Sequence, residues 1–205
     1  MKQEINLTVK PGYVKAYQEG YPLITQESIL DWSKVKDEGL IIHLLDDRKK
    51  FIAKGYYGKQ NKGYGWVLSA KKEVKIDVAY FSEKIKSALK YREDFIRDES
   101  TTAFRVLNGE GDGVGGLTID NFDGFYLLTW YSMGIYKFKE DILEALKKNV
   151  EYKGIYQKKR FDTKGQYLES HKEHVSQHCI AGSMIGHTEG PFLHWGKNLS
   201  ARVFV

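Results

Sequence analysis

The sequence has little cysteine, little proline and no long apolar segment. Its 205 residues contain one cysteine and three prolines. The single thiol, Cys179, excludes a disulfide within the chain, as is usual for proteins of reducing compartments. The longest nearly unbroken apolar run, FYLLTWY at 125–131, is far shorter than the roughly 20 residues that cross a bilayer. Residues 1–10 also lack the apolar core of a secretory signal. These absences predict a cytoplasmic protein that has no membrane partner.

The charge of the chain is only mildly one-sided. Lysine and arginine together number 32 and aspartate and glutamate 27, which leaves a formal charge of +5. A positive excess favours a nucleic-acid partner because it attracts phosphate, although many lysine-rich proteins bind none. The hydrophobic share of 41% and the charged share of 29% are those of a globular protein.

The pattern of apolar residues changes near residue 77. Before it, short alternating stretches and tight turns over residues 1–73 predict a small β-barrel. After it, apolar residues three and four positions apart predict a helix over 77–97, with Asp77 as its N-cap. Further elements are expected as strands at 102–108, 117–122 and 124–132, a helix at 138–150, and a basic strand-like segment at 154–162. We therefore expect an α+β fold, in which the barrel is followed by a mixed strand and helix domain at 77–189.

The segment LNGEGDGVGGLTIDNFDG, residues 107–124, contains the pattern G-x-G-x-x-G at Gly111, Gly113 and Gly116. Such a pattern cradles phosphate when a strand precedes it and a helix follows, because the helix N-terminus supplies free amide groups. Here a strand follows, and Glu110 and Asp112 would repel phosphate. We therefore favour a glycine-rich turn between two strands over a cofactor cradle.

The same segment resembles that of a known family. GEGDGVGGLTIDNF is similar to the hallmark GE-x-DG-x-x-GL-x-x-D of S-adenosylmethionine-dependent methyltransferases that modify cytosine C5 in large-subunit ribosomal RNA. Upstream, PGYVKAYQEGYPLIT, FIAKGYYGKQNKGYGWVLS and AFRVLNGEGDG occur in the order that this family shows. The resemblance implies a PUA-like RNA-binding barrel at 1–73, a central α/β domain, and large-subunit ribosomal RNA as the partner. A departure from the family's L-P-G-L occurs at residues 114–117, which read V-G-G-L.

A larger departure lies near the end of the chain. The resemblance fades after about Glu189, and residues 190–205 form an atypical tail where the family's catalytic domain would begin. That domain carries the family's S-adenosylmethionine site and its nucleophilic cysteine. We therefore expect a truncated or frame-shifted product, or an excised fragment, from which the Rossmann-like methyltransferase domain is absent, with no catalytic residue, no cofactor site and no activity alone. The alternative is a stand-alone RNA-binding or ribosome-associated adaptor, and both interpretations allow a homo-oligomer.

A thiol and five histidines are the other candidate reactive groups. They are Cys179, His171, His174, His178, His187 and His194. Their spacing matches no zinc module. A nucleophilic thiol needs an activating environment, and Cys179 precedes the domain in which the family's catalytic site lies. We therefore expect neither a metal site nor a catalytic cysteine here.

Three basic clusters are candidate RNA contacts, because lysines neutralise phosphates and aromatic rings stack on unpaired bases. The first lies within 54–68, where one of Tyr56 and Tyr57 should face the barrel core. The second adjoins the first turn and short helix, where PUA domains bind RNA by resemblance, and the third lies in the segment 154–162. Their residues are Lys54, Lys59, Lys62 and Tyr64; Lys10, Lys15 and Tyr17; and Lys158, Lys159 and Arg160. For each cluster the alternative is a solvated surface or a packed core.

Overall fold

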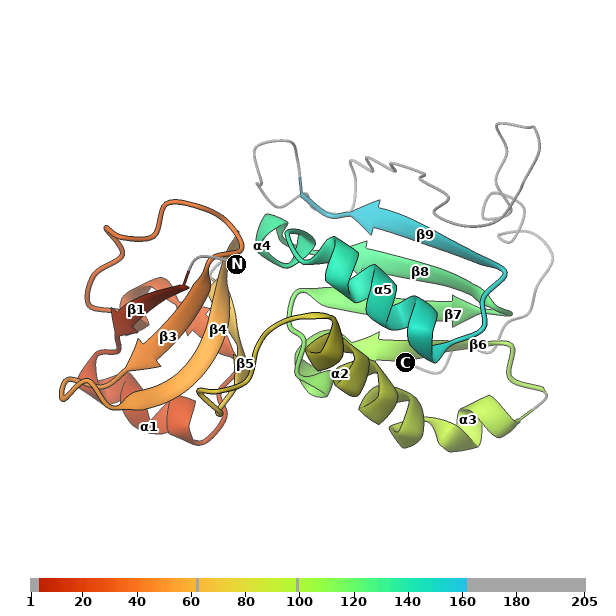
Figure 1. The fold of residues 1–205 in the computed structure, drawn as a ribbon, viewed down its shortest axis with the longest axis horizontal. Helices are drawn as coiled ribbons and strands as arrows, with labels where there is room; N and C mark the ends of the chain where they lie inside the picture. Colours follow the sequence, from red (N-terminus) through yellow and green to blue (C-terminus); the bar gives the residue numbers. More distant parts are fainter. Residues whose placement is uncertain (1–3, 62, 99, 162–205) are drawn as a thin grey trace.

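The computed structural model describes residues 4–61, 63–98 and 100–161. Two β-sheets lie side by side along the long axis of the molecule, and the segment 70–77 connects them (Figure 1). Among the helices of the described residues, none is long and apolar enough to cross a membrane.

The first sheet, here called the N-terminal barrel, has five strands in the order β1-β3-β4-β5-β2. They are β1 (Glu4–Thr8), β2 (Leu23–Thr25), β3 (Ile41–Leu45), β4 (Phe51–Gln60) and β5 (Gly63–Ser69). β1 pairs with β3 in parallel, and the other pairs are antiparallel. A bridge between Val9 and Ile29 brings the two edges together. The sheet therefore curls around a core that includes Ile24, Ile42 and Leu44.

Two short helical elements pack on the barrel between β1 and β3. They are α1 (Pro11–Gln18) and the 3-10 turn η1 (Gln26–Ser28). Pro11 occupies the first position of α1, where its fixed φ suits the helix and its missing N–H has no partner to lose. The predicted pattern of short strands, tight turns and one short helix is confirmed for β1, β3, β4, β5 and α1, whereas β2 and η1 were not predicted.

The second sheet, here called the C-terminal sheet, has the strand order β6-β7-β8-β9. Its strands are β6 (Ala103–Asn108), β7 (Leu117–Phe122), β8 (Phe125–Trp130) and β9 (Gly154–Lys159). β7 and β8 form a hairpin through Asp123 and Gly124, whose φ angles of 50° and 82° are those that a tight hairpin turn requires. The Asp-Gly pair in the sequence was a correct signal for this turn.

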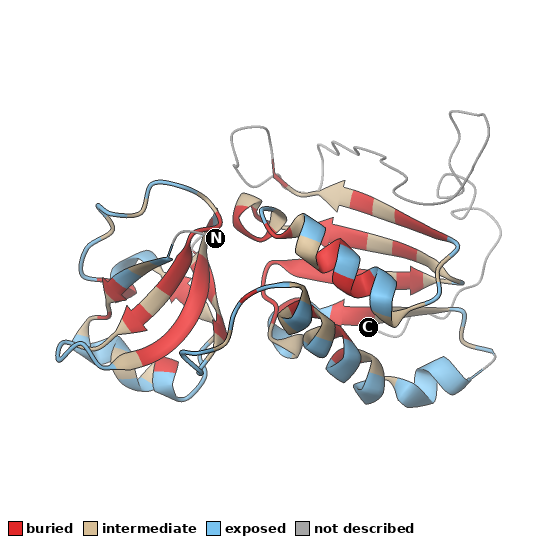
Figure 2. Ribbon diagram, in the orientation of Figure 1, coloured by how far each residue is buried: buried red, intermediate tan, exposed pale blue. Residues whose placement is uncertain are grey.

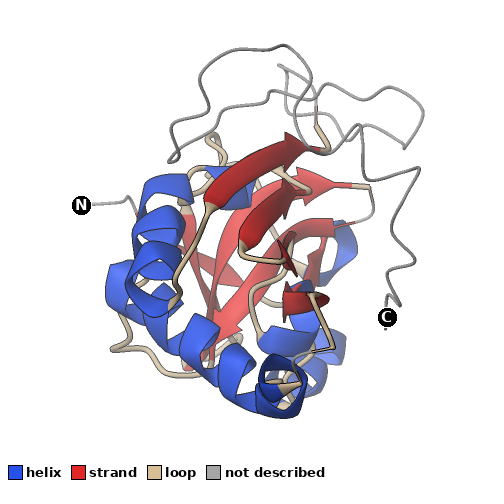
Figure 3. Cartoon of the chain, turned by 90° about the vertical axis from the view of Figure 1, so that its right-hand side faces the viewer, coloured by secondary structure: helices blue, strands red, loops and turns tan. Residues whose placement is uncertain are grey.

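Two helices cover one face of the C-terminal sheet (Figures 1 and 3). α2 (Val78–Tyr91) and α5 (Lys139–Asn149) pack together and bury Phe81, Ile85, Ile142 and Leu146 against the strands. The predicted N-cap is present, because the Asp77 carboxylate accepts a hydrogen bond of 3.1 Å from the backbone N–H of Tyr80. A short helix, α4 (Met133–Tyr136), precedes α5 and was not predicted.

The helix predicted over 77–97 is interrupted at Arg92. A separate turn, α3 (Glu93–Arg97), follows it and contains no buried residue. At the break, the Arg92 guanidinium donates to the carbonyl of Ala88 and to the carboxylate of Asp112. The continuous helix was therefore a wrong prediction over its last turn, where periodicity continues but no partner surface covers it.

The predicted fold class also needs correction. The sequence suggested an α+β chain from which a Rossmann-like domain is absent. However, β8 and β9 are parallel neighbours, and α4 and α5 form the crossover between them. A parallel β–α–β unit is the element from which Rossmann-like sheets are built. Strand order along the chain could not show this, because only tertiary structure decides that β9 pairs with β8 in parallel.

Besides the barrel's own core, a second hydrophobic cluster joins one side of the barrel to the C-terminal sheet. Buried residues of both sheets lie toward this junction (Figure 2). Ile41, Tyr56, Trp66 and Leu68 of the barrel pack with the buried side chains of the C-terminal sheet and its helices. β4 is buried along most of its length because it lies between the barrel interior and this junction. The relative position of the barrel and the C-terminal sheet is thus set by packing as well as by the connecting segment.

Candidate RNA-binding surface

The glycine-rich segment forms the junction between the barrel and the C-terminal sheet. It runs from β6 through the 3-10 turn η2 (Gly109–Asp112) into β7, so strand leads to strand, as predicted. A Cβ atom on Gly115 would clash with the indole ring of Trp66. The Trp66 Nε1–H donates to Glu110 Oε1 at 2.5 Å. The absence of a side chain at Gly115 therefore allows Trp66 to pack there, and the Tyr56 hydroxyl occupies the corresponding space beside Gly116.

The acidic residues of η2 are used within the protein. Asp112 accepts two hydrogen bonds from Arg92, at 3.2 and 2.8 Å, and one of 2.6 Å from the backbone N–H of Asn108. Lys84 approaches the same turn, and its burial lowers its pKa, an effect that Asp112 partly offsets. S-adenosylmethionine does not fit this segment, because Trp66 occupies the space beside Gly115 and Lys84 the space beside Gly113, while the Glu110 and Asp112 carboxylates are paired within the protein.

An aromatic cluster lies on the barrel surface and consists of Trp32, Tyr57 and Tyr64. The ring centroid of Trp32 lies 5.8 Å from that of Tyr57 and 5.0 Å from that of Tyr64. All three side chains are half-buried. The Lys59 ammonium lies 5.4 Å from the centre of the Tyr64 ring. A cation beside partly open aromatic faces is the combination that binds single-stranded RNA by stacking and charge.

Tyr56 and Tyr57 point to opposite sides of β4, as strand alternation required. Tyr56 is fully buried, and its hydroxyl donates to the carbonyl of Gly115 at 2.8 Å. Burial raises the pKa of Tyr56 well above its ordinary value. Trp32 was missed as a partner of Tyr57, because it lies 25 positions earlier in a loop without periodicity. The sequence alone could not predict this contact, because it does not show where the loop that carries Trp32 runs.

Two predicted RNA contacts prove to be buried. Tyr17 is 3% exposed, and its hydroxyl donates to Ser28 Oγ at 2.7 Å. Lys54 is 4% exposed, and its ammonium donates to the carbonyl of Val74 at 2.7 Å. Neither side chain can reach a phosphate or a base in this arrangement, so both are removed from the candidate surface. Strand alternation and helix periodicity alone did not predict that the side chains of Tyr17 and Lys54 point into the protein.

The remaining predicted residues of the barrel differ in accessibility. Lys59 and Lys15 are exposed, and Lys10 is half-buried. The Lys15 ammonium lies 3.7 Å from the Glu19 carboxylate, an exposed pair of small energetic weight. Lys62 lies outside the described residues.

The third basic cluster lies at the end of β9, beside α4. The Lys159 ammonium is 4.4 Å from the centre of the Tyr136 ring, and the Lys139 ammonium is 5.4 Å from it. Lys158 and Arg160 are half-buried neighbours on the strand and its end. The backbone N–H of Arg160 donates to the carbonyl of Trp130 at 2.7 Å. The structure thus adds Lys139 and Tyr136 to a cluster that sequence reasoning confined to residues 158–160.

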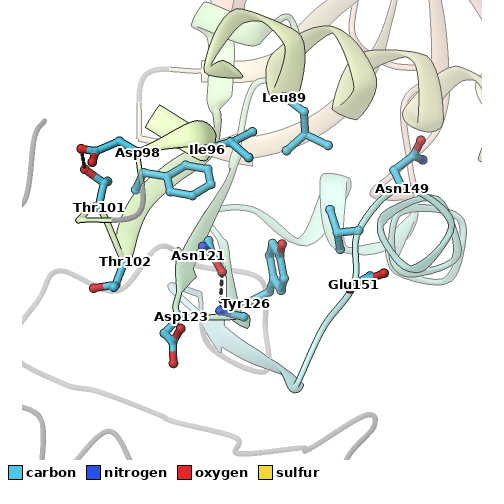
Figure 4. Close-up of a pocket in the computed structure, with 13 residues that line it drawn as sticks. Leu89, Ile96, Asp98, Thr101, Thr102, Asn121, Asp123, Tyr126, Asn149 and Glu151 are labelled. Carbon is cyan, nitrogen blue, oxygen red and sulfur yellow. Dashed lines mark hydrogen bonds between the residues drawn. The ribbon is translucent and has the colours of Figure 1, made fainter. Parts of the chain in front are cut away.

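A pocket of about 450 Å³ opens at the opposite end of the C-terminal sheet (Figure 4). Leu89, Ile96, Phe104 and Tyr126 supply apolar walls. Its polar rim carries three acidic residues and no basic one: Asp98, Asp123 and Glu151. Because carboxylates repel phosphate, this pocket is a poor site for an RNA backbone.

The cysteine and histidine candidates of the C-terminal region fall outside the described residues. These are Cys179, His171, His174, His178, His187 and His194, together with the segment 190–205. Within residues 4–61, 63–98 and 100–161, no group of three or more histidine, cysteine, aspartate or glutamate side chains could hold a metal ion.

Comparison with known proteins shows what the chain resembles. Residues 7–70 match the model of a PUA-like domain. A Bacillus subtilis protein, YwbD, which its name assigns to the ribosomal RNA large subunit methyltransferases, is 46% identical over 165 residues, or 80% of this chain and 42% of that protein. Ribosomal RNA large subunit methyltransferase I of Escherichia coli K12 is 25% identical over 69% of this chain and 36% of its own length.

Solved structures extend the similarity to the fold. A protein of Streptococcus mutans described as an S-adenosylmethionine-dependent methyltransferase matches with a TM-score of 0.74 and 29% identity, over 89% of this chain and 44% of that one. The methyltransferase SMU.776, crystallised with S-adenosylhomocysteine, matches with a TM-score of 0.68 and 28% identity, over 83% of this chain and 43% of its own.

These matches complete the correction to the fold class. Similarity to methyltransferase structures continues through both sheets and over 83–89% of the chain, so the prediction that no Rossmann-like part is present was wrong. The chain is similar to large-subunit rRNA methyltransferases and carries a PUA-like domain. It spans less than half the length of these relatives and structures.

Proposed function

We propose that this chain serves S-adenosylmethionine-dependent methylation of large-subunit ribosomal RNA, with cytosine C5 as the methylated atom. The observation that carries the proposal is the partly exposed cluster of Trp32, Tyr57, Tyr64 and Lys59 on a PUA-like barrel that is packed firmly against a methyltransferase-like sheet. The target atom is inferred from the hallmark GEGDGVGGLTIDNF and from the similarity to rRNA methyltransferases.

The barrel's part is to bind unpaired RNA. Trp32 and Tyr64 offer ring faces for stacking, which is worth about 1–3 kcal/mol per base. Lys59 adds charge beside them. Lys10 and Lys15, near α1, are proposed as a second and weaker phosphate contact, because both retain some exposure.

The junction's part is to hold the bound RNA at a fixed position relative to the C-terminal sheet. Tyr56 and Trp66 connect β4 and β5 to the glycine-rich segment by hydrogen bonds from their side chains. Fixed geometry matters in catalysis because a displacement of about 1 Å can cost roughly a hundredfold in rate. S-adenosylmethionine would supply the methyl group when bound, and the barrel and junction would orient the RNA.

A strain that lacks the gene for this chain tests the proposal. We expect bisulfite sequencing and nucleoside mass spectrometry to show the loss of one 5-methylcytosine from large-subunit rRNA. Reintroducing the gene should restore it, whereas a gene carrying both Trp32→Ala and Lys59→Ala should restore it only in part. An unchanged methylation map would refute the proposal and favour the alternative, an RNA-binding adaptor without enzymatic activity.

A further inference from the structure

We propose that a single RNA segment crosses the junction between the two sheets, so that the aromatic cluster of the barrel and a lysine cluster of the C-terminal sheet bind the same strand. The lysine cluster is defined as Lys137, Lys139 and Lys159, grouped around Tyr136. This inference rests on the RNA-binding role proposed above and deepens it, because it assigns a substrate class, single-stranded RNA, and a path.

The lysine cluster surrounds a tyrosine ring that is fixed by packing. The Tyr136 ring contacts Trp130 and Phe161, with centroids 5.4 and 5.6 Å away. Because packing holds this ring, the ammonium groups of Lys139 and Lys159 that lie over it are held as well. Tyr136 therefore brings two cations together at one ring. The side chain of Lys139 is 39% exposed, and its ammonium lies 3.3 Å from the Glu140 carboxylate. Because this ion pair is solvent-exposed and of small energetic weight, a phosphate can compete for the ammonium.

The two clusters are joined through the contact of α4 with β4. A Cβ atom on Gly134 would clash with the carbonyl of Tyr57 and with Gly58, so the helix backbone lies directly on the strand. A Cβ on Gly39 would likewise clash with the side chain of Lys137. The loop before β3, the end of β4 and α4 therefore meet at one place. Figure 1 shows α4 between the end of β4 and the end of β9.

Glu38 connects the charges of both sides. Its Oε1 accepts a hydrogen bond of 3.3 Å from the backbone N–H of Lys59. Its Oε2 is buried and has no hydrogen-bond partner among the described residues. Burial raises the pKa of Glu38, while Lys137 and Lys59 act in the opposite direction. The Glu38 carboxyl thus interacts electrostatically with Lys59 of the barrel and with Lys137, which directly follows α4. Together with the contact between Gly39 and the Lys137 side chain, this places the two clusters next to each other.

The chemistry of this surface fits unpaired RNA. The aromatic cluster can stack only on exposed bases, and in a duplex the bases are stacked inside the helix. The lysine cluster requires only phosphates, which any RNA strand supplies. A strand whose bases stack on Trp32 and Tyr64 can thus extend its backbone over Lys137 to Lys139 and Lys159. Short RNA would occupy the aromatic cluster alone, and longer RNA would reach both.

The test compares the fluorescence anisotropy of labelled oligouridines of about 5 and about 15 nucleotides, lengths near the lower and upper ends of common single-strand site sizes. The variants are Lys59→Ala, the double change Lys139→Ala with Lys159→Ala, and the control Lys147→Ala, an exposed lysine at the far end of α5. We expect the double change to weaken binding of the long oligomer about tenfold, to lower its salt slope by about 0.7 per lost contact, and to leave the short oligomer unaffected. Thermal melts establish that the variants fold.

The outcomes separate this inference from the proposed function. If Lys59→Ala weakens both oligomers and the double change weakens neither, the crossing path is wrong and the barrel remains an RNA site. If the double change weakens both lengths equally, the path is also wrong, because the short oligomer should not reach the C-terminal sheet. If the wild-type chain binds neither oligomer, the path and the proposed RNA-binding role both fail.

Discussion

The hydroxyl of Tyr56 donates a hydrogen bond of 2.8 Å to the backbone carbonyl of Gly115, across 59 positions of sequence and between the two sheets. Beside it, the Trp66 ring stacks on Tyr56 with centroids 5.5 Å apart and fills the space next to Gly115. Gly115, which lies within the glycine-rich segment but is not one of the three glycines of the G-x-G-x-x-G pattern, thus makes room for a barrel tryptophan. The following experiments examine this junction and the RNA surface that it supports.

Replacement of Gly115 by alanine should destabilise the protein. The added methyl group would overlap the Trp66 indole, and overpacking of this kind costs about 1–3 kcal/mol. Urea unfolding measures the change. Gly111→Ala is the matched control in the same turn, since the nearest atom to its Cβ would be 3.5 Å away. Equal stability of the two variants would contradict the assigned role of Gly115.

Replacement of Asp112 by alanine should cost about 3 kcal/mol, because it leaves the largely buried Arg92 guanidinium without its partner. The side chains of Arg92 and Asp112 are only 14% and 13% exposed. Removing Glu93, which pairs with the exposed Arg97, should change stability by at most about 0.5 kcal/mol. Thermal and denaturant unfolding of both variants provide the comparison, and a similar loss in both would show that burial of the first pair is unimportant.

Replacement of Trp32 by alanine should weaken RNA binding by about 1–3 kcal/mol, the stacking energy of one base. The control is Tyr91→Ala, which removes a tyrosine that is 86% exposed on α2, away from the proposed surface. Isothermal titration with single-stranded RNA measures both, after circular dichroism has verified the fold. If RNA binding depends on Tyr91 and not on Trp32, the RNA site lies on α2 and the proposed barrel site is wrong.

Replacement of Lys59 by alanine should reduce RNA affinity and flatten its dependence on salt. Loss of one phosphate contact lowers the slope of log K against log salt by about 0.7 to 1. Lys86→Ala removes the same charge from an exposed position on α2 and should leave the slope unchanged. RNA titrations at several salt concentrations measure these slopes. Identical slopes for wild type and Lys59→Ala would exclude a phosphate contact at Lys59.

Glu38 should make stability depend on pH. Its folded pKa is raised above the ordinary 4.5 by burial, so the folded state favours the protonated carboxyl. The raised pKa of Glu38 therefore contributes to the free energy of unfolding fully below pH 4.5, and this contribution is lost as the pH rises through the folded pKa. Glu38→Gln removes this dependence, and the Tm of the variant relative to wild type should therefore be higher at pH 7 than at pH 4. A constant difference between the two would show that Glu38 has an ordinary pKa.

Local patterns were sufficient for much of the fold. Alternation located the barrel strands, Asp123-Gly124 located a hairpin, and Asp77 marked the start of α2. These signals act over a few residues, because a hydrogen bond to the first turn or a positive φ depends only on near neighbours. The order of strand, glycines and strand likewise argued against a phosphate cradle, because no helix N-terminus follows the glycines.

The candidate site depended on contacts between distant parts of the chain. No local rule places Trp32 against Tyr57, buries Lys54 against Val74, or brings Lys139 beside Lys159 around Tyr136. The parallel pairing of β8 with β9, and with it the Rossmann-like character of the second sheet, is also a long-range choice. Residue order was enough for most of the elements and for the family resemblance, although not for α4 or for the break after α2. Packing across the junction decided which lysines and rings face solvent, because burial depends on what the rest of the chain covers.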